Sequence, residues 1–177
     1  DAWAASYEDE IARNGYATPT RTAKALRKFA PNVNLPVLDF GCGTGLSGLA
    51  LRLEGFETLD GLDLSPEMLE TARNKNVYRK LDVVDPDAKL PIASGAYPII
   101  AAIGVIGVGA APLSTFDILM RLLPKNGLFG LSFNDHALAD YRFEAKINEW
   151  VDCSAARLLF REYGDHLPGA NIKSNVY

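Results

Sequence analysis

The most constraining feature of the sequence is residues 36–48, where a short apolar run passes through closely spaced glycines into a second apolar segment. Residues 36–40 include a β-branched residue and have the pattern of a buried strand, whereas residues 46–53 have the pattern of a helix. The glycines between them lack Cβ atoms, so the backbone can turn sharply and a ligand can lie against bare amides. The stretch therefore predicts a strand, a ligand-binding glycine turn and a helix.

The glycine spacing is compatible with two kinds of cofactor. Residues 43–48 match the dinucleotide pattern G-x-G-x-x-G, and an acidic residue follows about twenty residues later. Asp39, however, lies two residues before Gly41, at the expected end of the strand and facing the same crevice. Its carboxylate would repel a pyrophosphate at close range and attract an ammonium or sulfonium group. The sequence thus favours a positively charged ligand over a dinucleotide.

The order hydrophobic-Asp-hydrophobic-Gly-Cys-Gly-Thr-Gly in residues 38–45 resembles the first motif of the class I S-adenosylmethionine-dependent methyltransferases. The resemblance implies S-adenosyl-L-methionine as the cofactor. It also implies that the cofactor lies near Asp39 and near the turn residues Gly41, Cys42, Gly43 and Gly45.

A second segment, residues 61–69, supports the same cofactor. Asp63 follows a strand expected over residues 56–62, and its two acceptor oxygens suit the paired hydroxyls of a ribose. Ser65 and Pro66 have the pattern of a helix start. The segment resembles the second cofactor segment of the same family, which implies that Leu64 and Met68 flank the adenosine.

A short third strand is expected over residues 78–81, followed by Asp82 and Val83. The resemblance implies that Asp82 accepts a hydrogen bond from the adenine amino group and that Val83 supplies the neighbouring backbone amide. Asp85 and Asp87 lie close by, so a shift of register would exchange these roles.

The apolar run Ile99–Ile103 predicts a central strand that is buried on both faces. Ile103 and Gly104 are expected at its carboxyl end, where the methyl donor would meet its acceptor. Family members usually carry an acidic residue after the aromatic that precedes this strand, whereas here Pro98 follows Tyr97. The segment after Gly104 is small and apolar, without the Asn/Asp-Pro-Pro-aromatic signature of enzymes that methylate amino groups of DNA or of protein glutamine.

The chain has two histidines, His136 and His166. His136 follows a strand expected over residues 128–133, at the substrate end of the crevice, and it is the most natural general base near neutral pH. An ordinary surface histidine is the alternative. His166 is expected in a Gly/Pro-rich turn of a closing hairpin.

Aromatic residues precede the expected core, namely Trp3, Tyr7 and Tyr16, and Thr18 with Pro19 predicts a helix start. The aromatics either pack on the outside of the sheet or form a lid over the cofactor. Their arrangement resembles the N-terminus of small methyltransferase-like proteins of the Williams–Beuren-region type. That resemblance favours the lid for Tyr16 and, less strongly, for Tyr7.

Composition limits the partners and the compartment. The net charge of −4 and the pI of about 5.2 give no polybasic footprint, so no nucleic acid and no membrane surface are expected as partners. No apolar run reaches the roughly 18 residues of a membrane span, and no signal peptide is visible. Cys42 and Cys153 have no spacing typical of a metal site or a disulfide. The sequence therefore predicts a cytoplasmic protein with free thiols and no metal.

Alternating strand and helix patterns predict one doubly wound α/β domain over residues 1–177, with ligands at the carboxyl ends of the strands. The resemblance implies a Rossmann-like methyltransferase sheet of order 3-2-1-4-5-7-6 with strand 7 antiparallel. We expect an N-terminal lid and helix over residues 1–34, a cofactor-binding core over 35–135, and a C-terminal helix and hairpin over 136–177.

The expected function is transfer of a methyl group from S-adenosylmethionine to a small-molecule acceptor by in-line displacement. Such a reaction depends on positioning more than on acid–base catalysis. A protein that binds S-adenosylmethionine or S-adenosylhomocysteine without turnover is the first alternative. An NAD-dependent oxidoreductase is the second, which Asp39 and the lack of a Tyr-x-x-x-Lys pair disfavour. The sequence indicates no oligomeric state.

Overall fold

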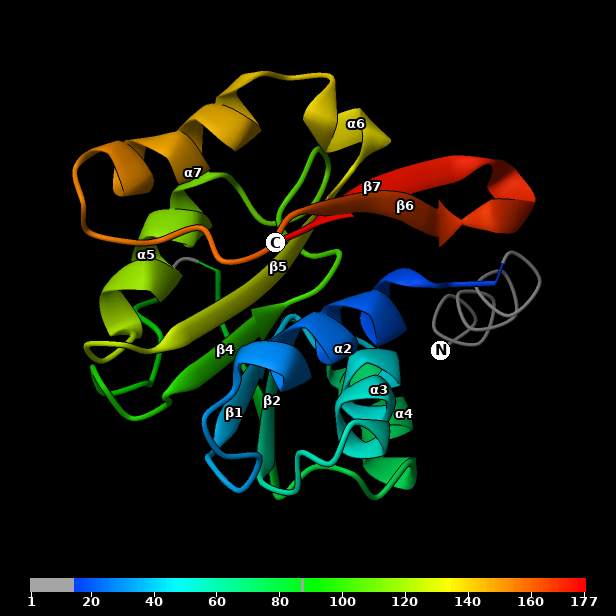
Figure 1. The fold of residues 1–177 in the computed structure, drawn as a ribbon. Helices are drawn as coiled ribbons and strands as arrows, with labels where there is room; N and C mark the ends of the chain where they lie inside the picture. Colours follow the sequence, from blue (N-terminus) through cyan, green and yellow to red (C-terminus); the bar gives the residue numbers. More distant parts are fainter. Residues whose placement is uncertain (1–14, 87) are drawn as a thin grey trace.

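A computed structural model of the protein describes residues 15–86 and 88–177, so Trp3, Tyr7 and Asp87 lie outside the described residues. Within these ranges the chain forms a seven-stranded sheet of order β3-β2-β1-β4-β5-β7-β6 (Figure 1). The strands are β1 (Val37–Phe40), β2 (Leu59–Asp63), β3 (Lys80–Val83), β4 (Ile99–Ala102), β5 (Leu128–Asn134), β6 (Glu162–Leu167) and β7 (Ile172–Val176).

The first five strands are parallel and β7 is antiparallel to both of its neighbours. The predicted sheet order and the antiparallel seventh strand are confirmed. Parallel strands require crossover connections, and here helices supply most of them. All five parallel strands consequently end at one edge of the sheet, where α/β proteins of this kind bind ligands.

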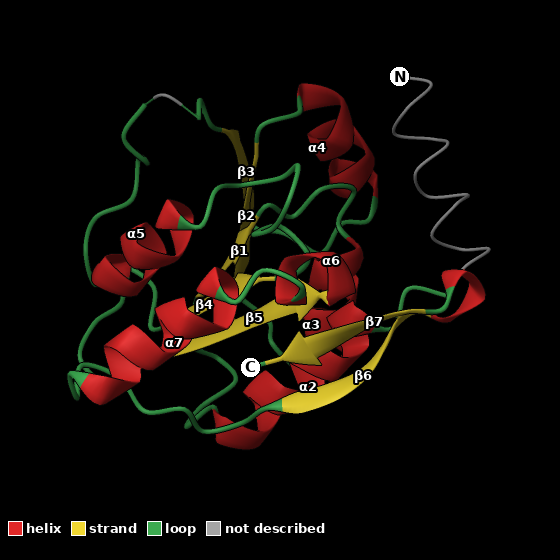
Figure 2. Ribbon diagram, turned by 90° about the horizontal axis from the view of Figure 1, so that it is seen from above, coloured by secondary structure: helices red, strands yellow, loops and turns green. Residues whose placement is uncertain are grey.

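Helices cover both faces of the sheet, with α2, α3 and α4 on one side and α5 and α7 on the other (Figure 2). The described helices are α2 (Thr18–Phe29), α3 (Leu46–Leu53), α4 (Pro66–Asn74), α5 (Ser114–Leu122), the single-turn α6 (Asp135–Leu138), α7 (Arg142–Asp152) and the 3₁₀ turn η1 (Pro168–Ala170). None of the helices in the described ranges has the length and apolar character that crossing a bilayer requires.

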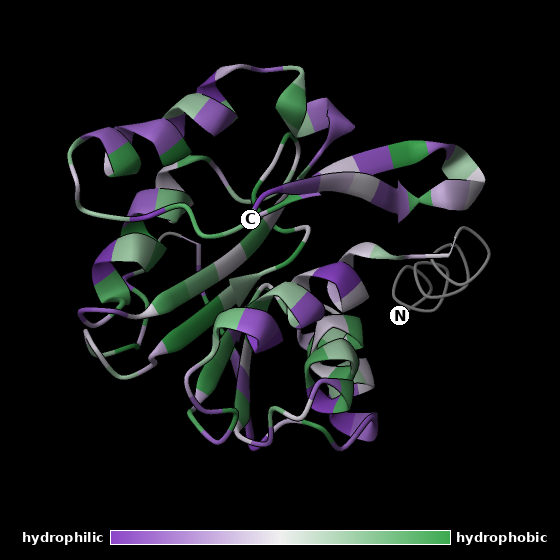
Figure 3. Ribbon diagram, viewed as in Figure 1, coloured by the Kyte–Doolittle hydropathy of each residue, from purple (hydrophilic) through white to green (hydrophobic). Residues whose placement is uncertain are grey.

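Two apolar cores lie on the two faces of the sheet. One joins Leu26 of α2 and Leu51 of α3 to the strands, and the other joins Phe116 of α5 and Phe143 of α7 to them. The central strand β4 is buried along its whole length and is apolar throughout, as Figure 3 shows. This agrees with the prediction of a strand buried on both faces.

Four local predictions need correction. The second strand begins at Leu59, three residues later than the pattern suggested. The third strand begins at Lys80, two residues later than expected, so Asp82 and Val83 lie within it and do not follow it. The N-cap of α2 is Ala17 and not Thr18, because the Thr18 hydroxyl is engaged by the C-terminal hairpin instead. His166 lies within β6 and is buried, and does not lie in the turn. By contrast, Ser65 caps α4 as predicted, since its Oγ accepts a hydrogen bond from the Met68 amide at 3.2 Å.

Candidate functional site

The glycine turn connects β1 to α3 and has a backbone conformation that its glycines allow. Gly41, Gly43 and Gly45 have φ angles of 69°, 53° and 90°, a left-handed region that side chains rarely adopt. A Cβ on Gly41 would lie 2.1 Å from Val105 Cγ2, so no side chain fits there. Gly45 is the N-cap of α3, and a Cβ there would lie 3.2 Å from Ala72 of α4, so this glycine lets the two helices pack closely.

Asp63 ends β2 and joins the glycine turn to the start of α4. Its Oδ2 accepts a hydrogen bond from the Gly43 amide at 2.8 Å, and its Oδ1 accepts one from the Ser65 amide at 2.9 Å. A carboxylate has about four lone-pair sites, so each oxygen keeps one for a further donor. The carboxylate is therefore fixed in place by the backbone and can still accept from two neighbouring hydroxyl groups.

Apolar side chains are exposed beside Asp63. Leu64 is 55% exposed after β2, and Val83, which pairs with Asp63 in the sheet, is 54% exposed at the end of β3. Exposed aliphatic side chains at a ligand-binding edge provide packing surface for a flat ring. Met68 is buried, and its sulfur would lie 3.8 Å from a Cβ on Gly43. Asp82 pairs with Lys80 at 2.5 Å and is one-third exposed.

Asp39 lies deeper than the sequence suggested. It is completely buried beneath the glycine turn, where its Oδ2 accepts hydrogen bonds from Ser47 Oγ and Tyr78 Oη, each at 2.6 Å. Its Oδ1 is buried without a hydrogen-bond partner among the described residues. Burial raises the pKa of this carboxyl to about 6, although the two hydroxyl donors lower it. An unsatisfied carboxylate oxygen fits a positively charged or proton-donating ligand group.

Ser47 and Tyr78, whose hydroxyl groups hold Asp39 in place, were not predicted from the sequence. The available signal was Gly48, the third glycine of the G-x-G-x-x-G match, whose amide donates to Tyr78 Oη at 3.0 Å. A Cβ on Gly48 would lie 2.3 Å from the same ring. This glycine therefore makes room for a tyrosine, which explains a match to the dinucleotide pattern without a dinucleotide.

Cys42 is buried in the turn, and burial together with the charges of Asp39 and Asp63 raises the pKa of its thiol. The thiol stays protonated at neutral pH and is a weak nucleophile. Its sulfur would lie 2.8 Å from a Cβ on Gly61, so the side chain packs against β2. In this structure Cys42 contributes packing within the turn.

The carboxyl end of β4 brings Gly104 to the same edge of the sheet. Ile103 is buried, whereas Gly104 is exposed and donates its amide hydrogen to Ser132 Oγ at 2.9 Å. Gly104 has a φ of +70°, and a Cβ there would lie 2.3 Å from Tyr16 Oη. The structure thus brings Tyr16 from the segment before α2 to the end of β4.

His136 is exposed on α6, directly after β5. The loop after β4 packs against this helix, since a Cβ on Gly107 would lie 3.9 Å from Ala137 Cβ. His136 therefore lies on the acceptor side of the sheet edge, but no contact places it at the end of β4. Its assignment as a general base stays a prediction.

The profile of the methyltransferase domain family matches residues 38–131, from β1 to β5. This chain belongs to the methyltransferase domain family. The match covers the glycine turn, Asp63, Asp82 and Gly104, whereas Tyr16 and His136 lie outside it. The predicted enzyme class is confirmed at the level of the family.

Among similar methyltransferases, the human methyltransferase-like protein 27 is 32% identical over 67% of this chain and 50% of its own length. The yeast 18S rRNA (guanine(1575)-N(7))-methyltransferase is 30% identical over 63% of this chain and 46% of its own length. The chain thus spans about half the length of these relatives. A methyltransferase solved with the Trm112 activator of Haloferax volcanii is 28% identical, has a TM-score of 0.60, and aligns with 75% of this chain and 57% of its own.

S-adenosylmethionine, the cofactor expected from the sequence, is confirmed by the methyltransferase family and by solved S-adenosylmethionine-dependent methyltransferases of similar fold. The residues present fit it, because the fixed Asp63 carboxylate and the orphaned buried oxygen of Asp39 lie at one edge of the sheet, beside a turn whose glycines carry no side chains.

The prediction of a small-molecule acceptor and no nucleic acid is wrong. The yeast relative is named for methylation of 18S rRNA. The ribosomal protein L11 methyltransferase of Vibrio vulnificus, named for a protein, is 31% identical over 54% of this chain and 32% of its own length. The exclusion of nucleic acid rested on the net charge of −4, which averages over the whole surface and does not exclude a local macromolecule-binding region.

Proposed function

We propose that this methyltransferase domain transfers the methyl group of S-adenosylmethionine to a nucleophile by in-line displacement. The observation that carries the proposal is the Asp63 carboxylate, which the amides of Gly43 and Ser65 fix at the end of β2. S-adenosylmethionine supplies a methyl group on a positively charged sulfur, whose neutral thioether is a good leaving group.

The cofactor's nucleoside would be held at the ends of β2 and β3. Asp63 would accept hydrogen bonds from the ribose hydroxyls, and the exposed side chains of Leu64 and Val83 would pack against the adenine. Asp82 would accept from the adenine amino group, exchanging part of its ion pair with Lys80 for that bond. The roles of Asp63, Leu64 and Asp82 keep the assignments made from the sequence, whereas the packing role of the Val83 side chain is added to its predicted backbone amide.

The amino-acid portion of the cofactor would lie over the glycine turn, near the start of α3. The buried Asp39 contributes negative potential beneath it, and its unsatisfied Oδ1 can accept a hydrogen bond. Tyr16 and Gly104 would border the place where donor and acceptor meet. Fixing both reactants there would supply most of the rate enhancement, because approximation alone can be worth about 7–11 kcal/mol.

For the acceptor, we propose a ring nitrogen of an RNA base. The support is the yeast relative, whose name specifies guanine N7, together with the chemistry of such an atom. A ring nitrogen of this kind carries a lone pair without a proton, so its methylation requires no general base. For such an acceptor, neither His136, which is exposed on α6, nor the Tyr16 hydroxyl at Gly104 has to remove a proton.

The test combines binding and turnover. Titration calorimetry should show binding of S-adenosylhomocysteine and none of NAD. Ribosomal RNA and ribosomal proteins are then supplied as separate acceptors, with the methylated product identified by mass spectrometry. We expect a methylated base in the RNA reaction only.

Methylation confined to the protein reaction would overturn the acceptor and leave the methyl transfer intact. Binding of S-adenosylhomocysteine with no turnover on either acceptor would favour the non-catalytic alternative. Binding of NAD alone would overturn the whole proposal. The cytoplasmic location also stays a prediction, which fractionation of cells that express the protein can test.

A further inference from the structure

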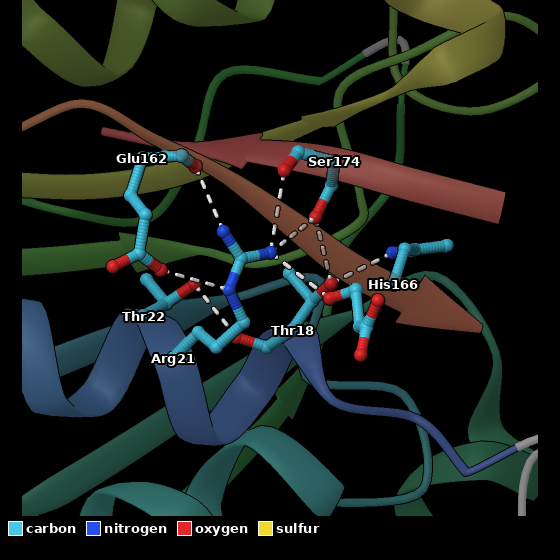
Figure 4. A network of polar contacts seen from close by, with 7 residues as sticks. Thr18, Arg21, Thr22, Glu162, His166 and Ser174 are labelled. Atoms are coloured by element: carbon cyan, nitrogen blue, oxygen red, sulfur yellow. Dashed lines mark hydrogen bonds and ion pairs between the residues drawn. The ribbon is translucent and has the colours of Figure 1, made fainter. Parts of the chain in front are cut away.

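The C-terminal hairpin makes an extensive polar contact with α2 that methyl transfer itself does not explain (Figure 4). The Arg21 guanidinium donates to Glu162 Oε1 at 3.1 Å and to the backbone oxygens of Glu162 and Asp165 at 2.8 and 2.9 Å. It also donates to Ser174 Oγ at 3.1 Å. These bonds fix the hairpin, formed by β6 and β7, against the first turns of α2.

His166 lies at the centre of this contact and touches three consecutive residues before and at the start of α2. Its carbonyl oxygen accepts a hydrogen bond from the Ala17 amide at 2.9 Å, and its Nδ1 lies 2.8 Å from Thr18 Oγ1. Its ring packs against Tyr16 edge to face, with centroids 5.1 Å apart and planes at 84°. One buried residue therefore contacts each of residues 16–18.

The hairpin is shaped to aim His166 inward. The register of β6 against β7 shifts between Asp165 and Leu167, so His166 is the residue at the irregularity. Such bulges redirect a side chain out of the regular alternation of a strand. His166 is consequently only 7% exposed, although the residues on either side of it are more exposed.

A chain of hydroxyl groups continues from the imidazole. Arg21 can only donate, so Ser174 Oγ accepts from it, and Ser174 can then donate to Thr18 Oγ1 at 2.9 Å. In this arrangement the Thr18 hydroxyl donates to His166 Nδ1, which requires a neutral ring. Burial lowers the pKa of His166, which is consistent with that state.

We propose that His166 is a positioning residue that holds the Tyr16 hydroxyl above Gly104, at the point where methyl donor and acceptor meet. The inference rests on the proposed function for the meaning of that point, but the placement itself is visible in the free protein. A Cβ on Gly104 would lie 2.3 Å from Tyr16 Oη, so the hydroxyl occupies the space that a side chain would take. The hairpin thereby shapes the mouth of a site to which it contributes no ligand-binding group.

The first test uses nuclear magnetic resonance on the free 19.2 kDa protein. We expect a nuclear Overhauser effect between the Tyr16 ring and the Gly104 Hα protons. It should disappear in His166→Leu and persist in Glu162→Gln, which weakens the same hairpin contact through Arg21 but leaves His166 in place. Persistence of the signal in a folded His166→Leu protein would overturn the inference.

The second test is a double-mutant cycle on S-adenosylhomocysteine affinity, measured by calorimetry. His166→Leu and Tyr16→Ala should each weaken binding about fivefold, and the double variant should be no weaker than Tyr16→Ala, because both changes remove one effect. If the double variant instead loses affinity by the product of the two single losses, His166 acts independently of Tyr16, and the inference is overturned.

A rescue variant keeps the inference testable if His166→Leu does not fold. His166→Phe retains an aromatic face for Tyr16 and should keep both the Overhauser effect and affinity within about twofold of the parent. Loss of the Overhauser effect in folded His166→Phe would overturn the edge-to-face contact as the positioning element. If the parent protein itself fails to bind S-adenosylhomocysteine, the proposed function fails, and the Overhauser measurement still decides the role of His166.

Discussion

Two buried carboxylates on adjacent strands have opposite environments. Asp60 of β2 pairs across the sheet with Leu38, the residue next to Asp39 of β1. Asp60 accepts hydrogen bonds from Arg79 Nε at 3.0 Å and from Tyr97 Oη at 2.7 Å. Burial raises its pKa, but these two partners outweigh burial and hold the pKa below the usual range. The chain itself satisfies this carboxylate.

Asp39 has two hydroxyl donors, no ion pair among the described residues, and one buried oxygen without a partner. Its pKa is raised to about 6. A carboxylate that the chain fully satisfies stabilises the fold, whereas a buried one left incomplete at the carboxyl edge of the sheet is a candidate for a role in the site. The difference separates a structural acid from acids of the site, Asp39 and Asp63.

The largest effect is expected at Asp63. Asp63→Ala should weaken S-adenosylhomocysteine binding at least about 100-fold, or about 2.7 kcal/mol, because both ribose hydroxyls lose their acceptor. The measurement is titration calorimetry, with circular dichroism to confirm folding. Asp63→Asn, which keeps one carbonyl acceptor, should fall between the parent and Asp63→Ala. Unchanged affinity in a folded Asp63→Ala protein would contradict the ribose assignment.

Asp60→Ala tests whether the carboxylate that the chain fully satisfies serves the fold alone. The substitution leaves the Tyr97 hydroxyl and the partly exposed Arg79 without their acceptor, and we expect a loss of about 2 kcal/mol in the free energy of unfolding. Urea denaturation measures it. Cofactor affinity should stay unchanged below the unfolding transition, and a large loss of affinity would show that Asp60 belongs to the site.

Asp39→Asn should stabilise the fold and lower the affinity for the cofactor. The folded-state pKa of about 6 exceeds the ordinary 3.8, so the cost of burying the charge is fully present above about pH 6 and is relieved as the pH falls toward 3.8. We expect the free energy of unfolding to rise by about 2 kcal/mol at about pH 7.5, as measured by urea denaturation, and this gain to shrink toward zero near pH 4. Affinity for S-adenosylmethionine should fall about tenfold. A loss of stability at both pH values would mean that the charge itself holds the turn.

The smallest effect is expected from Tyr78→Phe, which removes one of the two hydroxyl donors to Asp39. We expect a loss of about 1 kcal/mol in the free energy of unfolding. We also expect a further rise in the Asp39 pKa, which carboxyl-carbon nuclear magnetic resonance measures. Tyr97→Phe is the matched control, since it removes a hydroxyl from Asp60 in the same way. If Tyr78→Phe and Tyr97→Phe change cofactor affinity equally, the assignment of Asp39 to the site and of Asp60 to the fold is wrong.

Much of the fold followed from local patterns. The glycine turn, the Ser65 cap and the apolar run that became β4 depend on conformational preferences of a few neighbouring residues, which a sequence displays directly. The order of the strands came from the resemblance to a family. Strand boundaries were less predictable, as the late start of β2 at Leu59 shows, because pairing partners decide where a strand begins.

The site was predictable in its position along the chain and less so in its environment. Asp63 could be placed at the end of a strand because alternating elements put strand ends at one edge. The burial of Asp39 under Tyr78 could not be predicted. The two residues are separated by 39 positions, and they meet only after β2 has paired with both β1 and β3. Nucleic acid was wrongly excluded as a partner, because a net charge carries no information about local surface.

By itself the sequence determined the glycine turn, the helix start at Ser65 and the acids that follow β1 and β2, since these depend on residue type and spacing. Only the tertiary structure decided which acid is satisfied and which is left incomplete. It likewise moved Thr18 from an expected cap to a partner of His166 and brought Tyr16 over Gly104. The reason is physical, because burial and hydrogen-bond partners arise from contacts between distant segments, and no local pattern records them.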